Sequence, residues 1–310
     1  MIGEHEEASD ERREGYGAAP LRGLEHPRYE LVPVEGAREQ AIYLPAGAEV
    51  SVTCSPTLGI GSTIALAEEL LARGFPVVPH LAARLIEDET RLKAVLGRLE
   101  ERGLKDVFVV GGDSKVPAGP YASGLTLLRA MSRLGAGIER VGVPAYPEGH
   151  PLVAEEELTR ALLAKQPFAS YAVTQICFEP ETVLGWLARA REGGLKLPVY
   201  VGVPGVVDRK KLLRISLKIG LGDSMRFLKK QTGLVGRLLR PRGYSPDALI
   251  EGLSPYVGDP DYGIRGFHVN TFNHVEETER WRRGRLGSTA DGGVFEGVRR
   301  AAPAPMQGKE

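Results

Sequence analysis

From residue 25 onward, short apolar runs alternate along the chain with amphipathic stretches. The runs are rich in valine and apolar on consecutive residues, which is typical of strands buried on both faces of a parallel sheet. Eight such runs are present: YELVPV (29–34), EVSVTC (49–54), FPVVPHL (75–81), DVFVVGG (106–112), RVGVPAY (140–146), YAVTQICF (171–178), PVYVGVPG (198–205) and GFHVNTFN (266–273). The pattern therefore predicts eight buried parallel strands.

Most of the intervening segments have the periodicity and end signals of helices. The segment 61–74 offers Ser62 as a predicted N-cap and Gly74 as the residue just past the helix end. The connection 35–48 is short, so we expect its helix to be reduced to a turn or two.

Three further segments predict helices in the same way. Residues 180–194 place Pro180 in the first turn and Gly193 at the end, the positions where each residue is favoured. Residues 89–103 and 155–165 behave similarly.

Eight strands that alternate with helices over roughly 250 residues are the signature of a (β/α)8 barrel. A doubly wound open sheet is the alternative, and the lack of a G-x-G-x-x-G turn after the first run weakens its dinucleotide-binding form. We therefore predict an α/β protein with a barrel over residues 25–285. A disordered tail (1–24) precedes it and a loose tail (286–310) follows it.

Composition excludes several classes of protein. Formal net charge is +0, which gives no basic field for nucleic acid, and no apolar run approaches the length of about 20 residues that spans a bilayer. The polar N-terminus lacks the apolar core of a signal peptide, so we expect a cytoplasmic protein. Cys54 and Cys177 lie far apart in apolar runs, which favours two buried free thiols over a disulfide or a zinc site.

One segment departs from the neutral average. Residues 208–243 contain eleven Lys or Arg residues and two acids. This segment is either a solvated helix face or a site for an anionic ligand tail. Its single aromatic residue, Phe227, argues against stacking on nucleic acid bases.

Polar residues collect at the predicted strand ends, where a barrel of this kind carries its chemistry. They are Glu30, Thr53, His80, Asp113, the set Tyr146, Glu148 and His150, the pair Thr174 and Gln175, and the set His268, Asn270, Thr271 and Asn273. Glu30 stands out, because a carboxylate within a buried strand is costly unless it is paired or used. We expect its apolar neighbours Leu31 and Val32 to raise its pKa, as a general acid near neutral pH requires.

Missing groups narrow the chemistry further. The predicted strands contain no lysine, which argues against a Schiff-base aldolase, and the first strand has no His-x-His pair for a metal-dependent hydrolase. A metal site built from His80, Asp113 and His150 is possible but has no support from a sequence motif, so we predict no metal site.

The motifs at the strand ends resemble those of the methylenetetrahydrofolate reductase family, in family order over about residues 28–284. They are YELVPV with its glutamate, SVTCSP, PHLAAR, GGDSKVPAGPYASGL, AYPEGHP, VTQICFEPE and GFHVNTFNHVEE. The resemblance implies reduction of 5,10-methylenetetrahydrofolate to 5-methyltetrahydrofolate, with hydride passed from NADH or NADPH through FAD or directly.

Residue roles follow from the same resemblance. Glu30 would be the general acid that opens the folate ring, and Asp113 would hold the pterin and stabilise the iminium intermediate. The expected cofactor positions are Thr53, His80, Gly112, Asp113, Tyr121, Ala122, Tyr146, His150 and Glu157, and the expected substrate positions are Gln175, Thr271 and His274.

The sequence departs from the flavin-binding pattern in two places. Gly111 stands where the family has an arginine, and the helix 155–165 lacks the basic positions that hold the FAD phosphates, so direct hydride transfer from NADH is an alternative. A pterin-binding barrel acting in methyl transfer and a non-catalytic partner subunit are the competing functions. The oligomeric state stays open.

Overall fold

The computed structural model describes residues 21–135, 137–150, 153–206 and 245–287. The whole of the basic segment 208–243 lies outside these residues, as does most of each predicted tail. Leu24 is fully buried, so the packing of the barrel begins before residue 25, and the last helix continues to Gly287. Among the described helices, none combines the length and apolarity needed to cross a membrane.

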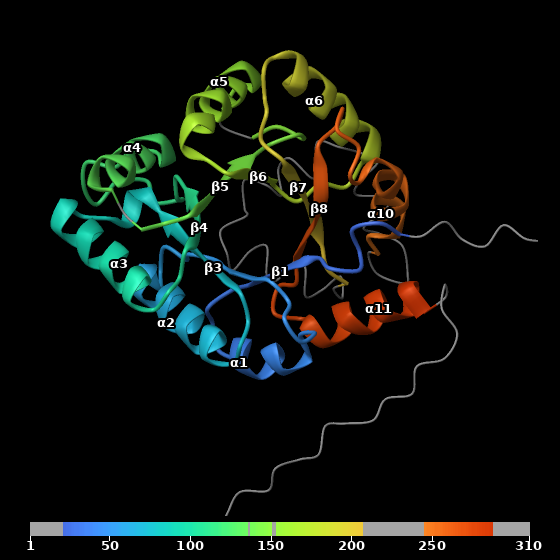
Figure 1. Ribbon diagram of the computed structural model, residues 1–310, viewed down its shortest axis with the longest axis horizontal. Helices are drawn as coiled ribbons and strands as arrows, with labels where there is room; N and C mark the ends of the chain where they lie inside the picture. The colour runs from blue at the N-terminus through green and yellow to red at the C-terminus, as the bar shows by residue number, and fades with distance from the viewer. Residues whose placement is uncertain (1–20, 136, 151–152, 207–244, 288–310) are drawn as a thin grey trace, which may run out of the picture.

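Eight parallel strands form a closed barrel in chain order, with β1 paired to both β2 and β8 (Figure 1). The strands are β1 (Arg28–Leu31), β2 (Val50–Val52), β3 (Val77–Ala82), β4 (Asp106–Val110), β5 (Arg140–Ala145), β6 (Tyr171–Thr174), β7 (Val199–Pro204) and β8 (Ile264–Asn270). Each lies within or overlaps one of the eight predicted runs, so the predicted (β/α)8 barrel is confirmed and the open sheet is excluded.

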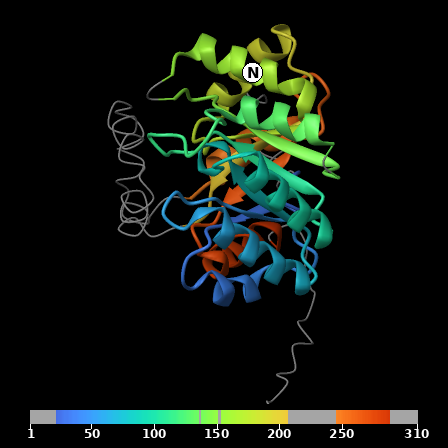
Figure 2. The same ribbon diagram turned by 90° about the vertical axis from the view of Figure 1, so that its left-hand side faces the viewer.

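Helices surround the strands in an outer ring, and from the side the blue-to-green helices follow one another in chain order (Figures 1 and 2). They are α1 (Ala37–Gln40), α2 (Gly59–Ala72), α3 (Glu89–Glu101), α4 (Gly124–Leu134), α5 (Glu155–Lys165), α6 (Pro180–Glu192), α10 (Asp247–Leu253) and α11 (Val275–Gly287). In the described part of the chain, short 3-10 turns accompany them: η1 (Ala41–Tyr43), η2 (Ala83–Leu85), η3 (Gln166–Phe168) and η4 (Ser254–Tyr256).

The predicted helix signals hold with one exception. Pro180 is the first residue of α6, Gly193 is its C-cap, and Gly74 adopts a left-handed φ of 88° after α2. Ser62 is not the N-cap of α2, because the backbone N–H of Gly59 already bonds to the carbonyl of Ser55 and the helix starts there. The Ser62 hydroxyl instead donates to the carbonyl of Leu58.

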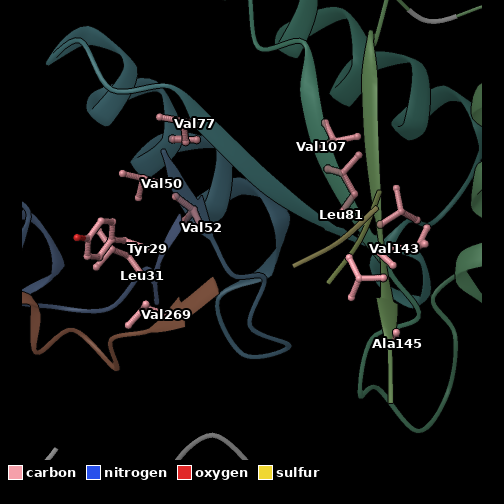
Figure 3. Close-up of a cluster of buried hydrophobic side chains, with 14 of the residues drawn as sticks. Tyr29, Leu31, Val50, Val52, Val77, Leu81, Val107, Val143, Ala145 and Val269 are labelled. Atoms are coloured by element: carbon pink, nitrogen blue, oxygen red, sulfur yellow. The ribbon is translucent and has the colours of Figure 1, made fainter. Parts of the chain in front are cut away.

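Alternation along the strands divides the side chains between two layers. Tyr29 and Leu31 on β1 point outward and pack with Val50, Val52 and Val269 beneath the helices (Figure 3). Arg28 and Glu30, one position away on the same strand, therefore face the barrel interior.

The N-terminal end of the barrel interior is filled. The Arg28 guanidinium lies between two aromatic rings, 4.2 Å from the centroid of Tyr171 and 4.1 Å from that of Tyr200. It pairs with Glu49, and Asp106 lies 3.6 Å away. Above this layer, Val78, Phe108, Tyr171 and Val173 form an interior cluster. A ligand must therefore approach from the C-terminal end of the strands, as is usual for such barrels.

The two cysteines are free. Cys177 is buried as predicted, whereas Cys54 is only half-buried. Burial raises the pKa of both thiols, so neither is an activated nucleophile.

Candidate active site

Glu30 lies on the interior side of β1 between histidines from two other strands. Its Oε2 is 3.1 Å from Nε2 of His268 on β8 and 3.9 Å from Nε2 of His80 on β3. The two imidazoles are buried, whereas the Glu30 side chain keeps 18% of its surface exposed. The carboxylate is therefore the member of this group that solvent or a ligand can reach.

Ser51 completes this group, which we call the Glu30 cluster: Glu30, Ser51, His80 and His268. Ser51 Oγ lies 2.6 Å from Nε2 of His80, and its hydroxyl donates to the carbonyl of Val78 at 3.4 Å. The short contact with Ser51 anchors the His80 ring on the side that faces Glu30.

The pKa of Glu30 is shifted in the direction opposite to the one expected from the sequence. Burial of the carboxyl raises its pKa, but the hydrogen bond from His268 and the electrostatic effects of His268 and His80 outweigh burial and lower the pKa below 4.5. The expectation of a raised pKa was wrong because it considered burial alone, whereas two histidines from other strands outweigh burial. Glu30 is therefore ionised at neutral pH in the free protein.

His80 is neutral at the same pH. Burial lowers its pKa to about 4, against a favourable contribution from the charge of Glu30 and an unfavourable one from His268. Its ring packs against Phe108 with centroids 4.7 Å apart. His80 thus carries no positive charge beside Glu30 at neutral pH.

The tautomer of His268 follows from its surroundings. Its Nδ1 is buried and has no hydrogen-bond partner, whereas its Nε2 faces Glu30. A bare nitrogen lone pair costs less when buried than an unpaired N–H, so the proton belongs on Nε2. His268 is therefore a fixed donor to Glu30. It occupies an interior position of β8, two residues before Asn270, and this period-two spacing is the sequence signal that identifies it.

The residues after β8 hold the backbone of Glu30 in place. Thr271 is fully buried, and its hydroxyl donates to the Glu30 carbonyl at 2.7 Å. The amide side chain of Asn273 bonds to both the N–H and the carbonyl of Val32, each at 2.9 Å. Thr271, expected to touch substrate, is thus directed to the protein backbone. Asn273 has a left-handed φ of 57°, a conformation that asparagine tolerates.

A second group of predicted residues meets at the ends of β4 and β5. The rings of Tyr146 and His150 pack edge to face with centroids 5.4 Å apart. Burial, with a smaller contribution from the nearby charge of Asp113, raises the pKa of Tyr146. Asp113 itself is exposed. The structure thus brings Asp113, Tyr146 and His150 together.

Arg84, which the sequence motifs did not single out as a site residue, organises the loop that carries Asp113. Its guanidinium donates to three carbonyls of that loop, those of Ser114 at 2.6 Å, Lys115 at 2.7 Å and Ala122 at 2.9 Å. Gly112 lets the start of this loop pass close to Ala82. Its φ is 92°, and a Cβ at this position would lie 3.1 Å from Cβ of Ala82.

The remaining predicted residues occupy varied environments. Gln175 is exposed directly after β6, and Thr53 is half-buried directly after β2. Glu157 is exposed on the first turn of α5. Tyr121 is buried in the hydrophobic core beside charges of α3 and α4, so it supports the loop from below. His274 starts the turn into α11, with its Nδ1 3.7 Å from Glu277.

The start of α5 does not fit the pyrophosphate of FAD. The first turn of α5 carries three carboxylates, Glu155, Glu156 and Glu157, which repel phosphate. Arg160 follows at helical spacing from two of them, which offsets its charge. A cleft between β5, α5 and α6 also lacks a cation among its lining residues, Ala145, Tyr146, Glu155, Leu158, Thr159, Leu162 and Trp186.

Comparison with known proteins agrees with the motif resemblance. A family model described as methylenetetrahydrofolate reductase matches residues 44–220, more than half of the 310 residues. The match begins after β1 and therefore does not include Glu30. Methylenetetrahydrofolate reductase 1 of Schizosaccharomyces pombe is 25% identical over 133 residues, which span 40% of this chain and 22% of that protein.

Similar solved structures are more distant. One is a Burkholderia cenocepacia protein provisionally described as a lyase/mutase, with a TM-score of 0.44 and 12% identity over 84% of this chain and 79% of that one. Another is a chitinase from Rhizomucor miehei, with a TM-score of 0.34 and 12% identity over 60% of this chain and 71% of that one. On the strength of the family match, the chain belongs to the methylenetetrahydrofolate reductase family.

Proposed function

We propose that this barrel reduces the methylene group of 5,10-methylenetetrahydrofolate to the methyl group of 5-methyltetrahydrofolate. The observation that carries the proposal is the partly exposed carboxylate of Glu30, paired with His268 in a barrel interior that is filled from the other end. An ionised carboxylate in such a place is costly to maintain unless it is used. Family membership supplies the substrate class.

Glu30 would move the proton in this reaction. Opening of the imidazolidine ring breaks the bond between N10 and the methylene carbon and leaves a cationic iminium at N5. The proton that N10 gains comes from the carboxyl of Glu30, which is reprotonated from solvent. Because the bound pterin removes the remaining water around Glu30, the pKa of the carboxyl rises on binding, which favours proton uptake at that stage.

Asp113 would stabilise the iminium. Its carboxylate is exposed beside Tyr146 and opposes the positive charge that forms on N5. Gln175, exposed after the neighbouring strand β6, offers an amide that can both donate to and accept from the pterin or the nicotinamide. Tyr146 and His150 would provide a ring surface for the bound heterocycle.

The hydride would come directly from a reduced nicotinamide dinucleotide. It adds to the iminium carbon, so that the nicotinamide is oxidised and the folate carbon is reduced to a methyl group. The acidic first turn of α5 is a poor site for tightly held phosphates. This favours a nicotinamide that binds and dissociates in each turnover, rather than a flavin that stays bound. The visible spectrum of the purified protein tests this point, since a bound flavin absorbs blue light and makes the protein yellow.

The activity is tested by following the nicotinamide absorbance after mixing the protein with NADH or NADPH and methylenetetrahydrofolate. We expect oxidation of one of the two donors with formation of methyltetrahydrofolate. Glu30→Gln should retain folate binding and lower kcat by about 10²–10⁴, as expected for a lost acid–base group. Glu39→Gln, which changes an exposed glutamate on α1, is the matched control.

Three outcomes would contradict the proposal or the role it gives to Glu30. A wild-type protein that binds no folate and oxidises neither donor has a different function. Full activity in Glu30→Gln would remove Glu30 from the chemistry. Folate binding without oxidation of either donor would instead point to a barrel that binds the one-carbon carrier for methyl transfer.

A further inference from the structure

A tight turn after β5 presents one carboxylate toward the next strand's loop. Residues 146–149 form the turn, closed by the bond from the N–H of Gly149 to the carbonyl of Tyr146 at 3.1 Å. Pro147 suits the second position of such a turn, and Gly149 follows it with a φ of 82°. Glu148 occupies the third position, between the two predicted site residues Tyr146 and His150.

The Glu148 carboxylate bonds to the backbone just before α6. Its Oε1 accepts from the N–H of Phe178 at 2.7 Å and from the N–H of Glu179 at 3.2 Å. Glu179 is the N-cap of α6 and has no capping bond from its own side chain, and Pro180 has no N–H to offer. Glu148 therefore accepts, from another loop, the N–H of the N-cap residue of α6 and that of the residue before it.

This arrangement is made at an electrostatic cost. Burial raises the pKa of Glu148, and the charge of Glu179 raises it further. The two backbone hydrogen bonds lower the pKa, but by less than burial raises it. A half-buried carboxylate beside a second carboxylate is unfavourable, and the positive end of the α6 dipole offsets only part of that. The gain must lie in what the two bonds hold together.

Among the described residues, the backbone pairing of the two strands ends before these loops begin. Strands β5 and β6 are paired up to Ala145 and Thr174, and the N–H of Gln175 makes the last backbone bond, 2.7 Å to the carbonyl of Ala145. Beyond that point the N–H of Cys177 bonds to Gly202 on β7, which draws the β6 loop toward the opposite neighbour. The two bonds of Glu148 draw the β6 loop back toward the β5 loop.

We propose that Glu148 is a positioning residue that joins the loop after β5 to the loop after β6 and so fixes Tyr146 relative to Gln175. The functional part of this inference rests on the proposed reductase activity, in which both residues contact the bound heterocycle. The structural part, a junction made by one carboxylate oxygen, stands independently of the activity.

The junction is tested by hydrogen exchange on the ligand-free protein, with Glu148→Ala, Glu148→Gln and the exposed Glu192→Ala as a matched control. In Glu148→Ala the amides of Phe178 and Glu179 should exchange about 10-fold faster or more, since each loses a bond to a charged acceptor. In Glu148→Gln the amide oxygen can still accept both bonds, so exchange should stay close to that of the wild type.

Kinetics then test the positioning. Glu148→Ala should lower kcat/KM for the folate about 10-fold or more, and Glu148→Gln should recover most of it, because geometry and not charge is required. Unchanged exchange of Phe178 and Glu179 in Glu148→Ala would overturn the junction. Normal exchange with strongly reduced kcat/KM in Glu148→Gln would overturn the positioning role in favour of a role for the charge. If the wild type has no activity on folate, the proposed function fails. Hydrogen exchange of Phe178 and Glu179 then still decides whether Glu148 joins the two loops.

Discussion

Oε2 of Glu30 lies 3.1 Å from Nε2 of His268, although the two residues are 238 positions apart in the chain. They meet because β1 and β8 pair in parallel, which closes the barrel and places Glu30 beside Asn270 and Arg28 beside His268. Closure of the sheet therefore assembles the candidate acid–base pair. A change that loosened the contact between the first and last strands would disrupt folding and chemistry together.

The first prediction concerns the pH dependence that His268 imposes on Glu30. Replacing His268 by leucine removes the N–H donor and leaves the burial of Glu30 in place, so the pKa of Glu30 should rise. The limb of the pH profile of kcat/KM that reports Glu30 should move to higher pH. His268→Gln keeps a donor of similar reach and should move the limb less.

Glu30→Gln identifies that limb, because the limb should vanish from the profile of this variant. Circular dichroism and thermal unfolding of His268→Leu and His268→Gln separate a loss of fold from a change in titration. A folded His268→Leu variant with the wild-type profile would contradict the coupling.

The second prediction concerns stability and the neutral form of His80. Its pKa is lowered from 6.5 to about 4 by burial, so the folded state binds fewer protons than the unfolded state between these values. The stabilisation is fully present above pH 6.5 and is lost as pH falls toward 4, a difference of about 3 kcal/mol. Urea unfolding of the wild type and of His80→Gln across this range measures it.

In His80→Gln the amide can still form a hydrogen bond with Ser51 but does not titrate. The difference in unfolding free energy between the wild type and this variant should therefore grow as the pH rises from 4.5 to 6.5. Parallel curves for the two proteins would show that His80 does not titrate on unfolding in this range.

The sequence was sufficient to predict the barrel because each strand is a short valine-rich run with its own turn signals. Polar residues at strand ends, such as Glu30 and His80, were equally visible, because a barrel brings those ends together. The pKa of Glu30 could not be predicted in the same way. It depends on His80 and His268, and no local pattern states which distant side chains share the interior with a given carboxylate.

The role of Arg84 could not be predicted from its neighbours in the sequence either. A basic residue after a strand reads as a solvated side chain, and only the folded path of residues 111–122 brings three loop carbonyls around its guanidinium. The same holds for Glu148, whose partners are backbone N–H groups about 30 positions away. Such side chain to backbone bonds between loops leave no periodicity in the sequence.

The third prediction follows from the bonds of Arg84. Arg84→Met keeps the apolar stem but removes the donors to Ser114, Lys115 and Ala122, so the loop that carries Asp113 should loosen. We expect a loss of roughly 1–3 kcal/mol in the free energy of unfolding. Trypsin should cleave after the exposed Lys115 faster than in the wild type.

Arg129→Met is the control for this variant, because it removes an exposed arginine of α4. It should leave both the unfolding free energy and cleavage after Lys115 unchanged. Arg84→Lys retains one cationic donor and should fall between Arg84→Met and the wild type. Cleavage at the wild-type rate in Arg84→Met would mean that the loop is held by other contacts.

The fourth prediction uses two glycines in opposite environments. A Cβ on Gly142 of β5 would lie 2.6 Å from the Phe108 ring and closer still to the Tyr171 ring, inside the filled part of the barrel. Tyr171 cannot move aside easily, because its hydroxyl donates to Asp106 and its face covers Arg28. Gly142→Ala should therefore destabilise the protein by about 1–3 kcal/mol or more.

Gly97 of α3 provides the matched comparison. No atom lies within 4 Å of a Cβ placed there, and the residue is in the interior of a helix, where alanine is favoured over glycine by about 1 kcal/mol. Gly97→Ala should therefore stabilise the protein while Gly142→Ala destabilises it, and urea unfolding of both measures the contrast. Equal stabilities for the two variants would show that the barrel interior yields to an added methyl group, in which case the rings that fill its N-terminal end are not closely packed.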